Sequence, residues 1–179
     1  MSNAAESVIS PVLTRGLTPP EDAAALRRTF GGFPSGVVAL AAVVDGSPSV
    51  LVASSFTVGV SLDPPLCTFA VQKSSKTWRI LERAERIGVS ILSTEHAASV
   101  RQMAGPDTAT RLDGIDLVHT HGGALLIEGS PVHLECRIVD QHPAGDHAIV
   151  VLEVIGTESH DQHSPVVVHA SRFHAAVAI

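Results

Sequence analysis

The densest local positive charge in the sequence is the segment KSSKTWR, at residues 73–79. Its side-chain donors are Lys73, Ser74, Ser75, Lys76, Thr77 and Arg79. The segment lies where an apolar, strand-like run leads into a helical pattern. Free backbone N–H groups at the start of a helix bind phosphate, and hydroxyl and ammonium groups add further donors. These residues are therefore a candidate phosphate site, with an ordinary helix cap and solvated lysines as the alternative.

A second segment, ASSFT at residues 53–57, places small residues at the end of an apolar run. Small side chains there would let a flat ligand approach the backbone, whose N–H and C=O groups can bind the polar edge of a heterocycle. The alternative is a plain turn with Phe56 in the core. Pro64 and Pro65 follow, and because they cannot donate to a ladder they fix the entry into the next strand. The pattern predicts a ledge suited to a planar ligand that it does not identify.

Metal chemistry is the third possibility, because the chain has 10 histidines. His119 and His121 alternate on one strand face, and His160 and His163 are three residues apart. A zinc site needs three or four ligands and supporting contacts. Both pairs lie in polar segments typical of solvated histidine, so we expect no metal. The sequence contains no GxGxxG fingerprint, P-loop, GxSxG elbow or CxxC pair.

Composition limits the class of protein. The 179 residues are 45% hydrophobic and 17% charged, with a formal net charge of -6, which indicates a folded domain and argues against general nucleic-acid binding. The longest apolar run, VVALAAVV at residues 37–44, is too short to span a bilayer, which takes roughly 20 residues. No secretory signal is visible, so we expect a cytoplasmic protein without membrane contact. Cys67 and Cys136 lie in apolar runs and are predicted to be buried free thiols.

The elements that must position these residues are mostly strands. Residues 1–20 have no periodicity and are expected to form a flexible N-terminal arm. Helix signals follow at 20–30, 74–86 and 94–105, and the pair of runs around Asp45-Gly46 indicates a hairpin. A second, long hairpin is predicted around the turn PAGD at residues 143–146. We expect about seven strands and three helices without βαβ alternation, hence a mainly antiparallel β-barrel with peripheral helices formed by residues 21–179.

Several segments occur in the same order as in the flavin reductase-like family. They are FPSGVVAL, VASSFTVGVSLDPPL, KSSKTW, RLDGIDL, LECRI and GDHAIVVLEV. The chain resembles this family over roughly residues 21–175, and SSFTVGVSLDPPL and GDHAI are the specific parts. The resemblance implies a split β-barrel that binds FMN or FAD, usually as a homodimer with the flavin near the interface.

The resemblance also implies roles for individual residues. Those bordering the flavin would be Pro34, Ser35, Gly36 and Val37. Those holding the edge of the isoalloxazine ring would be Val52, Ala53, Ser54, Ser55, Phe56 and Thr57. Those at the phosphate end would be Lys73, Ser74, Ser75 and Thr77. Those on the nicotinamide side would be Gly145, Asp146, His147, Arg172 and Phe173, with His147 as the positioning or proton-relay group of the reaction.

The function implied is hydride transfer from NADH or NADPH to FMN or FAD, with the reduced flavin passing to a partner monooxygenase. No arginine pair is placed for a 2′-phosphate, which favours NADH. The main alternative is a flavin-binding electron carrier that never meets NADH. A metal- or haem-binding barrel that uses the histidine pairs, and an oxidase on a related barrel, are further alternatives.

Overall fold

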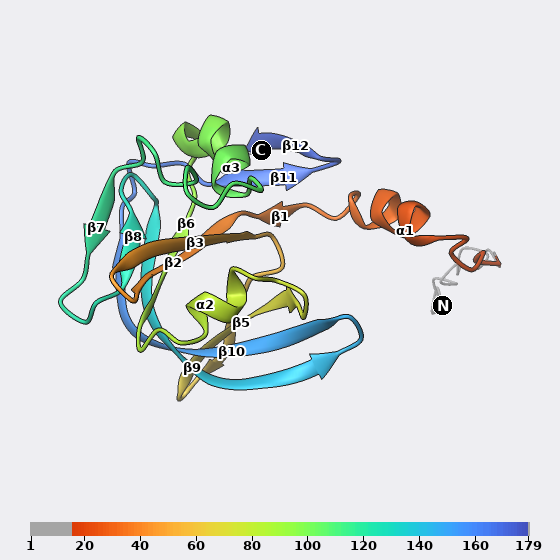
Figure 1. The fold of residues 1–179 in the computed structure, drawn as a ribbon. Coiled ribbons are helices and arrows are strands. Elements are labelled where there is room, and N and C mark those ends of the chain that lie inside the picture. Colours follow the sequence, from red (N-terminus) through yellow and green to blue (C-terminus); the bar gives the residue numbers. More distant parts are fainter. Residues whose placement is uncertain (1–15, 179) are drawn as a thin grey trace, which may run out of the picture.

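The computed structural model describes residues 16–178, which form a mainly β structure (Figure 1). The helices are α1 (Ala23–Phe30), α2 (Trp78–Leu81) and α3 (Ala97–Met103), with a 3-10 turn, η1 (Thr94–His96), before α3. The strands are β1 (Ser35–Gly36), β2 (Val38–Val44), β3 (Ser47–Ala53), β4 (Thr57–Leu62), β5 (Pro65–Gln72), β6 (Ile87–Ile91), β7 (Leu117–His119), β8 (Leu125–Ile127), β9 (Val132–Ala144), β10 (His147–Ser159), β11 (Val166–His169) and β12 (Arg172–Ala175).

The strands form three sheets in which every pair is antiparallel. The largest has seven strands in the order β3-β2-β6-β9-β10-β5-β4, and the smaller ones are β1-β11-β12 and β7-β8. In Figure 1 the long β9–β10 hairpin runs along the bottom, and β11, β12 and α3 lie at the top. The predicted class, mainly β and antiparallel with few helices, is confirmed.

Strand β2 is buried on both faces because alternate residues enter two different cores. Val38 and Leu40 belong to the core enclosed by the seven-stranded sheet and α2. Ala39 and Ala41 belong to a second core, shared with α3, β8 and β11. A strand buried on both sides has a continuous apolar sequence, which explains VVALAAVV.

Helix α1 begins where its capping residues predict. The Asp22 carboxylate accepts a hydrogen bond from the Ala25 N–H at 2.7 Å, and two arginines lie in the last turn, as the helix dipole favours. The helix has no buried residue and stands apart from the sheets in Figure 1. One backbone hydrogen bond of 2.8 Å, from Ala170 N–H to Gly31 C=O, joins its end to the β11–β12 turn.

Two expectations were wrong in detail. The described residues form twelve strands where about seven were expected. The sequence did not indicate β4 or short strands such as β1, β7 and β8, which have only two or three residues each. Gly59 has a φ of 69° and the β4–β5 register is irregular between Thr57 and Ser61, so β4 lacks a regular two-residue period. The second helix ends at Leu81, because the N–H groups of Arg83 and Ala84 bond to carbonyls three residues back and tighten the chain into turns.

Other expectations concern the thiols and the chain start. Cys67 and Cys136 are both free and buried, as predicted. The hydrogen bond from the Cys136 thiol to Cys67, together with burial, raises the pKa of the Cys136 thiol. Within residues 16–178, no helix is long and apolar enough to cross a membrane. The predicted arm lies largely outside the described residues, and residues 16–20 are exposed and irregular.

Candidate active site

Three adjoining pockets meet at Ser54, between the end of β3 and the start of β4. The largest, about 800 Å³, is lined by Phe30, Phe33, Pro34, Ser35, Gly36, Ser54, Ser55, Phe56, Thr57 and Val58. The second, about 380 Å³ and called here the His147 pocket, is lined by Leu51, Val52, Ala53, Ser54, Ser55, Ala70, Val71, Gln72, Ser75 and His147. The third, about 260 Å³, adds residues of the β11–β12 turn. We call the three adjoining pockets together the Ser54 groove.

The ledge in this groove is held by Ser55. Its hydroxyl donates to the Ala70 C=O at 2.9 Å and accepts from the Ala70 N–H at 3.0 Å. The side chain thus takes the place of a backbone partner for β5 and ties the ledge to that strand. The N–H groups of residues 54–56 have no backbone partner among the described residues. These donors remain available to a ligand, whereas the Ser55 hydroxyl is already used.

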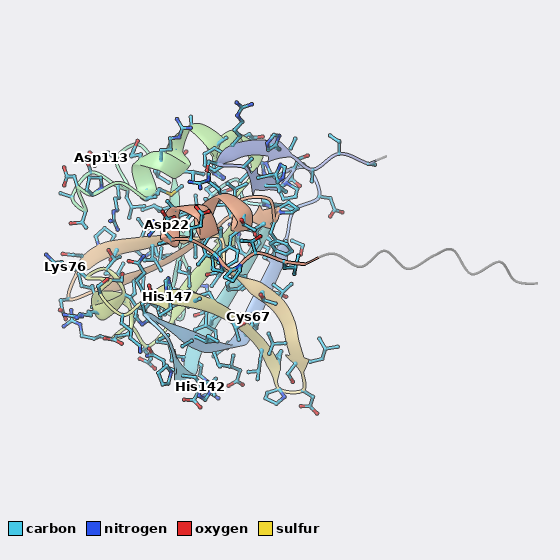
Figure 2. The ribbon with its side chains drawn as sticks, turned by 90° about the vertical axis from the view of Figure 1, so that its right-hand side faces the viewer. Asp22, Cys67, Lys76, Asp113, His142 and His147 are labelled. Carbon is cyan, nitrogen blue, oxygen red and sulfur yellow. The ribbon has the colours of Figure 1, made fainter. Side chains whose placement is uncertain are left out.

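The proposed phosphate residues divide between two sides of α2. Ser75 lines the His147 pocket, and its hydroxyl accepts a hydrogen bond from the Trp78 N–H at 3.1 Å. Lys73 and Ser74 are exposed beside it. Thr77 is buried and lines a separate pocket of about 450 Å³ together with Lys76 and Arg111, called here the Arg111 pocket. In Figure 2, Lys76 lies at the left edge of the view, apart from His147.

Thr77 is engaged by Arg111, which joins three segments. The Nη1 atom of Arg111 donates to the Thr77 hydroxyl at 2.9 Å and to the Val50 C=O at 3.0 Å. Its Nε donates to the Gly105 C=O at 2.7 Å. Thr77 therefore makes a structural hydrogen bond and does not line the Ser54 groove.

A Thr77→Val variant tests that assignment. It removes one hydrogen bond to a charged donor, so we expect a loss of about 1–2 kcal/mol in the free energy of unfolding. That loss corresponds to a Tm lower by about 2–8 °C, measured by thermal denaturation. Ligand affinity of the Ser54 groove should not change. Thr108→Val is the control, because Thr108 is an exposed threonine that lines the same pocket. A normal Tm with weakened ligand binding would place Thr77 in the site instead.

The β9–β10 turn is fastened to the loop after β5. Lys73 donates through Nζ to the Gly145 C=O at 2.7 Å and through its N–H to the Asp146 C=O at 3.0 Å. The His147 ring donates from Nδ1 to the Asp146 carboxylate at 2.8 Å. This hydrogen bond, then the charges of His147 and Lys73, hold the pKa of Asp146 below its usual value. The carboxylate therefore stays ionised, and orients His147, until the pH falls through that lowered value.

The remaining predicted residues lie in several places. Val37 is buried, with its side chain in the second core. Arg172 and Phe173 lie on β12, which pairs with β11 and belongs to a different sheet from His147. The Phe173 side chain packs against the second core. None of these three residues lines the three pockets that meet at Ser54.

The groove also contains residues that the sequence reasoning missed. Phe30 and Phe33 are 67% and 75% exposed and line the largest pocket. Their position beside the GGFPSG break was the available signal, since exposed aromatic side chains often mark binding surfaces. Gln72 lines the His147 pocket, where the register pairs it with His147. It is the last residue of β5 and follows Phe69, Ala70 and Val71.

Comparison with known proteins identifies the architecture. A family model described as a flavin reductase like domain matches residues 30–176. The chain belongs to the flavin reductase-like family. It is 36% identical over 154 residues to the NADH-dependent FAD reductase of Streptomyces globisporus, covering 82% of this chain and 83% of that protein. The resemblance inferred from the sequence is confirmed.

A solved structure and another relative are also similar to this flavin reductase-like protein. The structure of the Streptomyces globisporus C-1027 NADH:FAD oxidoreductase in complex with NAD and FAD fragments aligns with a TM-score of 0.82 at 33% identity, covering 91% of this chain and 98% of that one. The reductase subunit of a flavin-dependent monooxygenase from Mycobacterium tuberculosis is 32% identical over 129 residues, which is 72% of this chain and 68% of that protein.

Proposed function

We propose that this protein is an NADH-dependent flavin reductase that binds its flavin in the Ser54 groove. The observation that carries the proposal is the junction of the pockets at Ser54. One contains exposed aromatic residues and the other contains Ser75 and His147. A flavin and a nicotinamide could therefore be held against each other. We favour FAD and NADH because the S. globisporus relative is named an NADH-dependent FAD reductase.

The groove fits a planar heterocycle that carries a phosphate chain. Its two larger pockets measure about 800 and 380 Å³, within the range of roughly 300–1,000 Å³ usual for cofactor-sized ligands. The walls at Phe30, Phe33 and Phe56 are apolar, and the backbone N–H groups of residues 54–56 offer donors to a heterocycle edge. Lys73 and Ser75 supply a positive charge and a hydroxyl for phosphate.

In this proposal the chain binds and orients, and the cofactor provides the redox chemistry. A bound flavin supplies the acceptor for the hydride of NADH. The ledge at residues 54–56 holds the edge of the heterocycle, and the aromatic walls exclude water from its face. His147, fixed at Nδ1 by Asp146, is placed to position the nicotinamide or to relay a proton. Gly145 and Asp146 shape the turn that carries it. Arg172 and Phe173 lie on a neighbouring sheet, and the proposal assigns them no contact with the nicotinamide.

Lys73 and Lys76 form a matched pair for testing phosphate binding. We expect Lys73→Met to raise the Kd for FMN about 10-fold and to leave the Kd for riboflavin unchanged, because riboflavin lacks the phosphate. Tenfold corresponds to about 1.4 kcal/mol. Both constants are measurable by fluorescence titration.

Lys76→Met is the control, since it removes the same charge beside the Arg111 pocket. Equal weakening of FMN and riboflavin by Lys73→Met would show that Lys73 acts only by holding the β9–β10 turn.

The proposal extends to a partner monooxygenase that receives the reduced flavin. It is supported by the relative named as the reductase subunit of a flavin-dependent monooxygenase.

A homodimer in the cytoplasm is part of the same proposal. The exposed α1, which ends at the groove residue Phe30, is available to a second copy. Sedimentation velocity measures the oligomeric state directly.

The test of the function is NADH oxidation followed at 340 nm with FAD, FMN, riboflavin or no added flavin. Flavin-dependent loss of NADH supports the reductase, and the flavin with the highest kcat/KM identifies the cofactor. Parallel assays with NADPH identify the nucleotide. Flavin binding without consumption of either nucleotide would overturn the proposal in favour of an electron carrier.

A further inference from the structure

Three residues with metal-binding side chains meet at the end of the β9–β10 hairpin opposite His147. His133 near the start of β9 and Glu158 near the end of β10 are directly paired across the two strands. His160 follows β10, and its N–H donates to the Pro131 C=O at 2.8 Å, which fixes its backbone beside the same strand end. One ligand atom from each of His133, Glu158 and His160 lies within 4.8 Å of the others.

The decisive feature is the His133 ring, which is buried with a relative exposure of 3%. Its Nε2 lies 2.8 Å from the Ile127 C=O. A carbonyl only accepts hydrogen bonds, so Nε2 carries the ring hydrogen and Nδ1 keeps a free lone pair. That Nδ1 atom is buried and has no hydrogen-bond partner among the described residues. Buried polar atoms are rarely left in this state, and a histidine oriented by a carbonyl is the usual arrangement of a metal ligand.

The separations of the ligand atoms suit a small cation. His133 Nδ1 lies 3.6 Å from Glu158 Oε2, and His160 Nε2 lies 3.4 Å from the same oxygen. Two ligands at about 2.0–2.1 Å from a tetrahedral zinc ion are about 3.3 Å apart. The carboxylate oxygen is thus already close to its place relative to both rings. The ligand nitrogens of the two histidines also lie within 4.8 Å of each other.

A fourth position is open. A pocket of about 340 Å³ is lined by His133 and Glu158 and also by Thr120, Glu135 and Gly156. The Glu135 carboxylate accepts a hydrogen bond from the Thr120 hydroxyl at 3.1 Å. Water or an exchangeable ligand can enter from this pocket and complete a four-coordinate site.

We propose that His133, Glu158 and His160 bind one divalent transition-metal ion, with zinc as the best match to a set of two imidazoles and one carboxylate. The site is separate from the Ser54 groove and does not depend on the proposed function. It departs from the expectation of no metal because spacing in the sequence paired His160 with His163. The fold also brings His160 to His133, with ring centroids 5.4 Å apart, compared with 6.4 Å between His160 and His163.

The test uses tag-free protein, treated with EDTA and dialysed, and titrated with ZnCl₂ by calorimetry. We expect one ion per chain. Glu158→Gln and His160→Gln should each weaken zinc binding by roughly 10-fold or more, since loss of an outer-shell partner alone costs about 10–100-fold. Both positions are partly exposed, with side chains 62% and 28% accessible, so these variants should fold where a change of the buried His133 could fail.

His142→Gln is the matched control, because His142 lies beside one carboxylate, that of Asp140 at 3.3 Å, without a third ligand in the described cluster. It should leave zinc affinity unchanged. Cobalt(II) gives an independent readout, since a tetrahedral site produces intense visible absorption that Glu158→Gln and His160→Gln should abolish. No zinc binding by the original protein, or equal binding by the original protein and both variants, would overturn the proposal. Equal loss in His142→Gln would also overturn it, by showing general surface binding.

Discussion

Ser54→Trp is expected to abolish flavin binding without unfolding the protein. Ser54 is exposed and lines all three pockets that meet in the groove. An indole at this position occupies the space in which the ledge and the aromatic walls would hold the ring system. We expect the Kd for FAD and FMN to rise more than about 100-fold, which corresponds to a loss of about 2.8 kcal/mol of binding free energy. NADH oxidation should fall with it.

The measurement is flavin fluorescence titration beside thermal denaturation. Ser47→Trp is the control, because Ser47 is an exposed serine at the start of β3, whereas Ser54 follows the end of that strand, and Ser47 lines the Arg111 pocket instead. It should bind flavin normally. If Ser54→Trp retained flavin affinity within about twofold, the groove at Ser54 would not be the flavin site.

Local chemistry made the main elements predictable from the sequence. Asp45 and Gly46 adopt φ values of 51° and 76°, the conformation that an Asp-Gly pair favours in a two-residue hairpin. The β9–β10 hairpin was equally visible, because Gly145 with a φ of 62° closes the turn between two long strand-forming runs. The ledge was predicted for the same reason, since small polar residues end the apolar run of β3. These features depend on neighbours in the sequence.

Features that depend on side-chain direction or strand register were not predictable. Ser75 and Thr77 look alike in the sequence, but in the turn that leads into α2 their side chains line different pockets. One lines the His147 pocket and the other meets Arg111. The pairing of His133 with Glu158 depends on the register of β9 and β10. That register shifts twice between the hairpin turn and this pair. Periodicity in a single sequence does not give that register.

His147→Ala is expected to separate the two halves of the proposed reaction. His147 lines the His147 pocket of the groove, and among the described residues its hydrogen-bond partner is Asp146, at Nδ1. Loss of the ring should lower kcat/KM for NADH about 10–100-fold, equivalent to about 1.4–2.8 kcal/mol of transition-state stabilisation. The Kd for flavin should stay within about twofold, because the ledge and the aromatic walls remain intact. Steady-state kinetics and flavin titration measure the two effects.

The KM and kcat for NADH distinguish the two roles open to this residue. A rise in KM alone would indicate that His147 binds the nicotinamide equally in the ground and transition states, whereas a fall in kcat would indicate positioning or proton relay. His142→Ala is the control, because His142 lies on β9 of the same hairpin, at the bottom of Figure 2, and also lies beside an aspartate. A parallel loss of flavin affinity in His147→Ala would show that His147 contributes to flavin binding. Unchanged kinetics would remove it from the reaction.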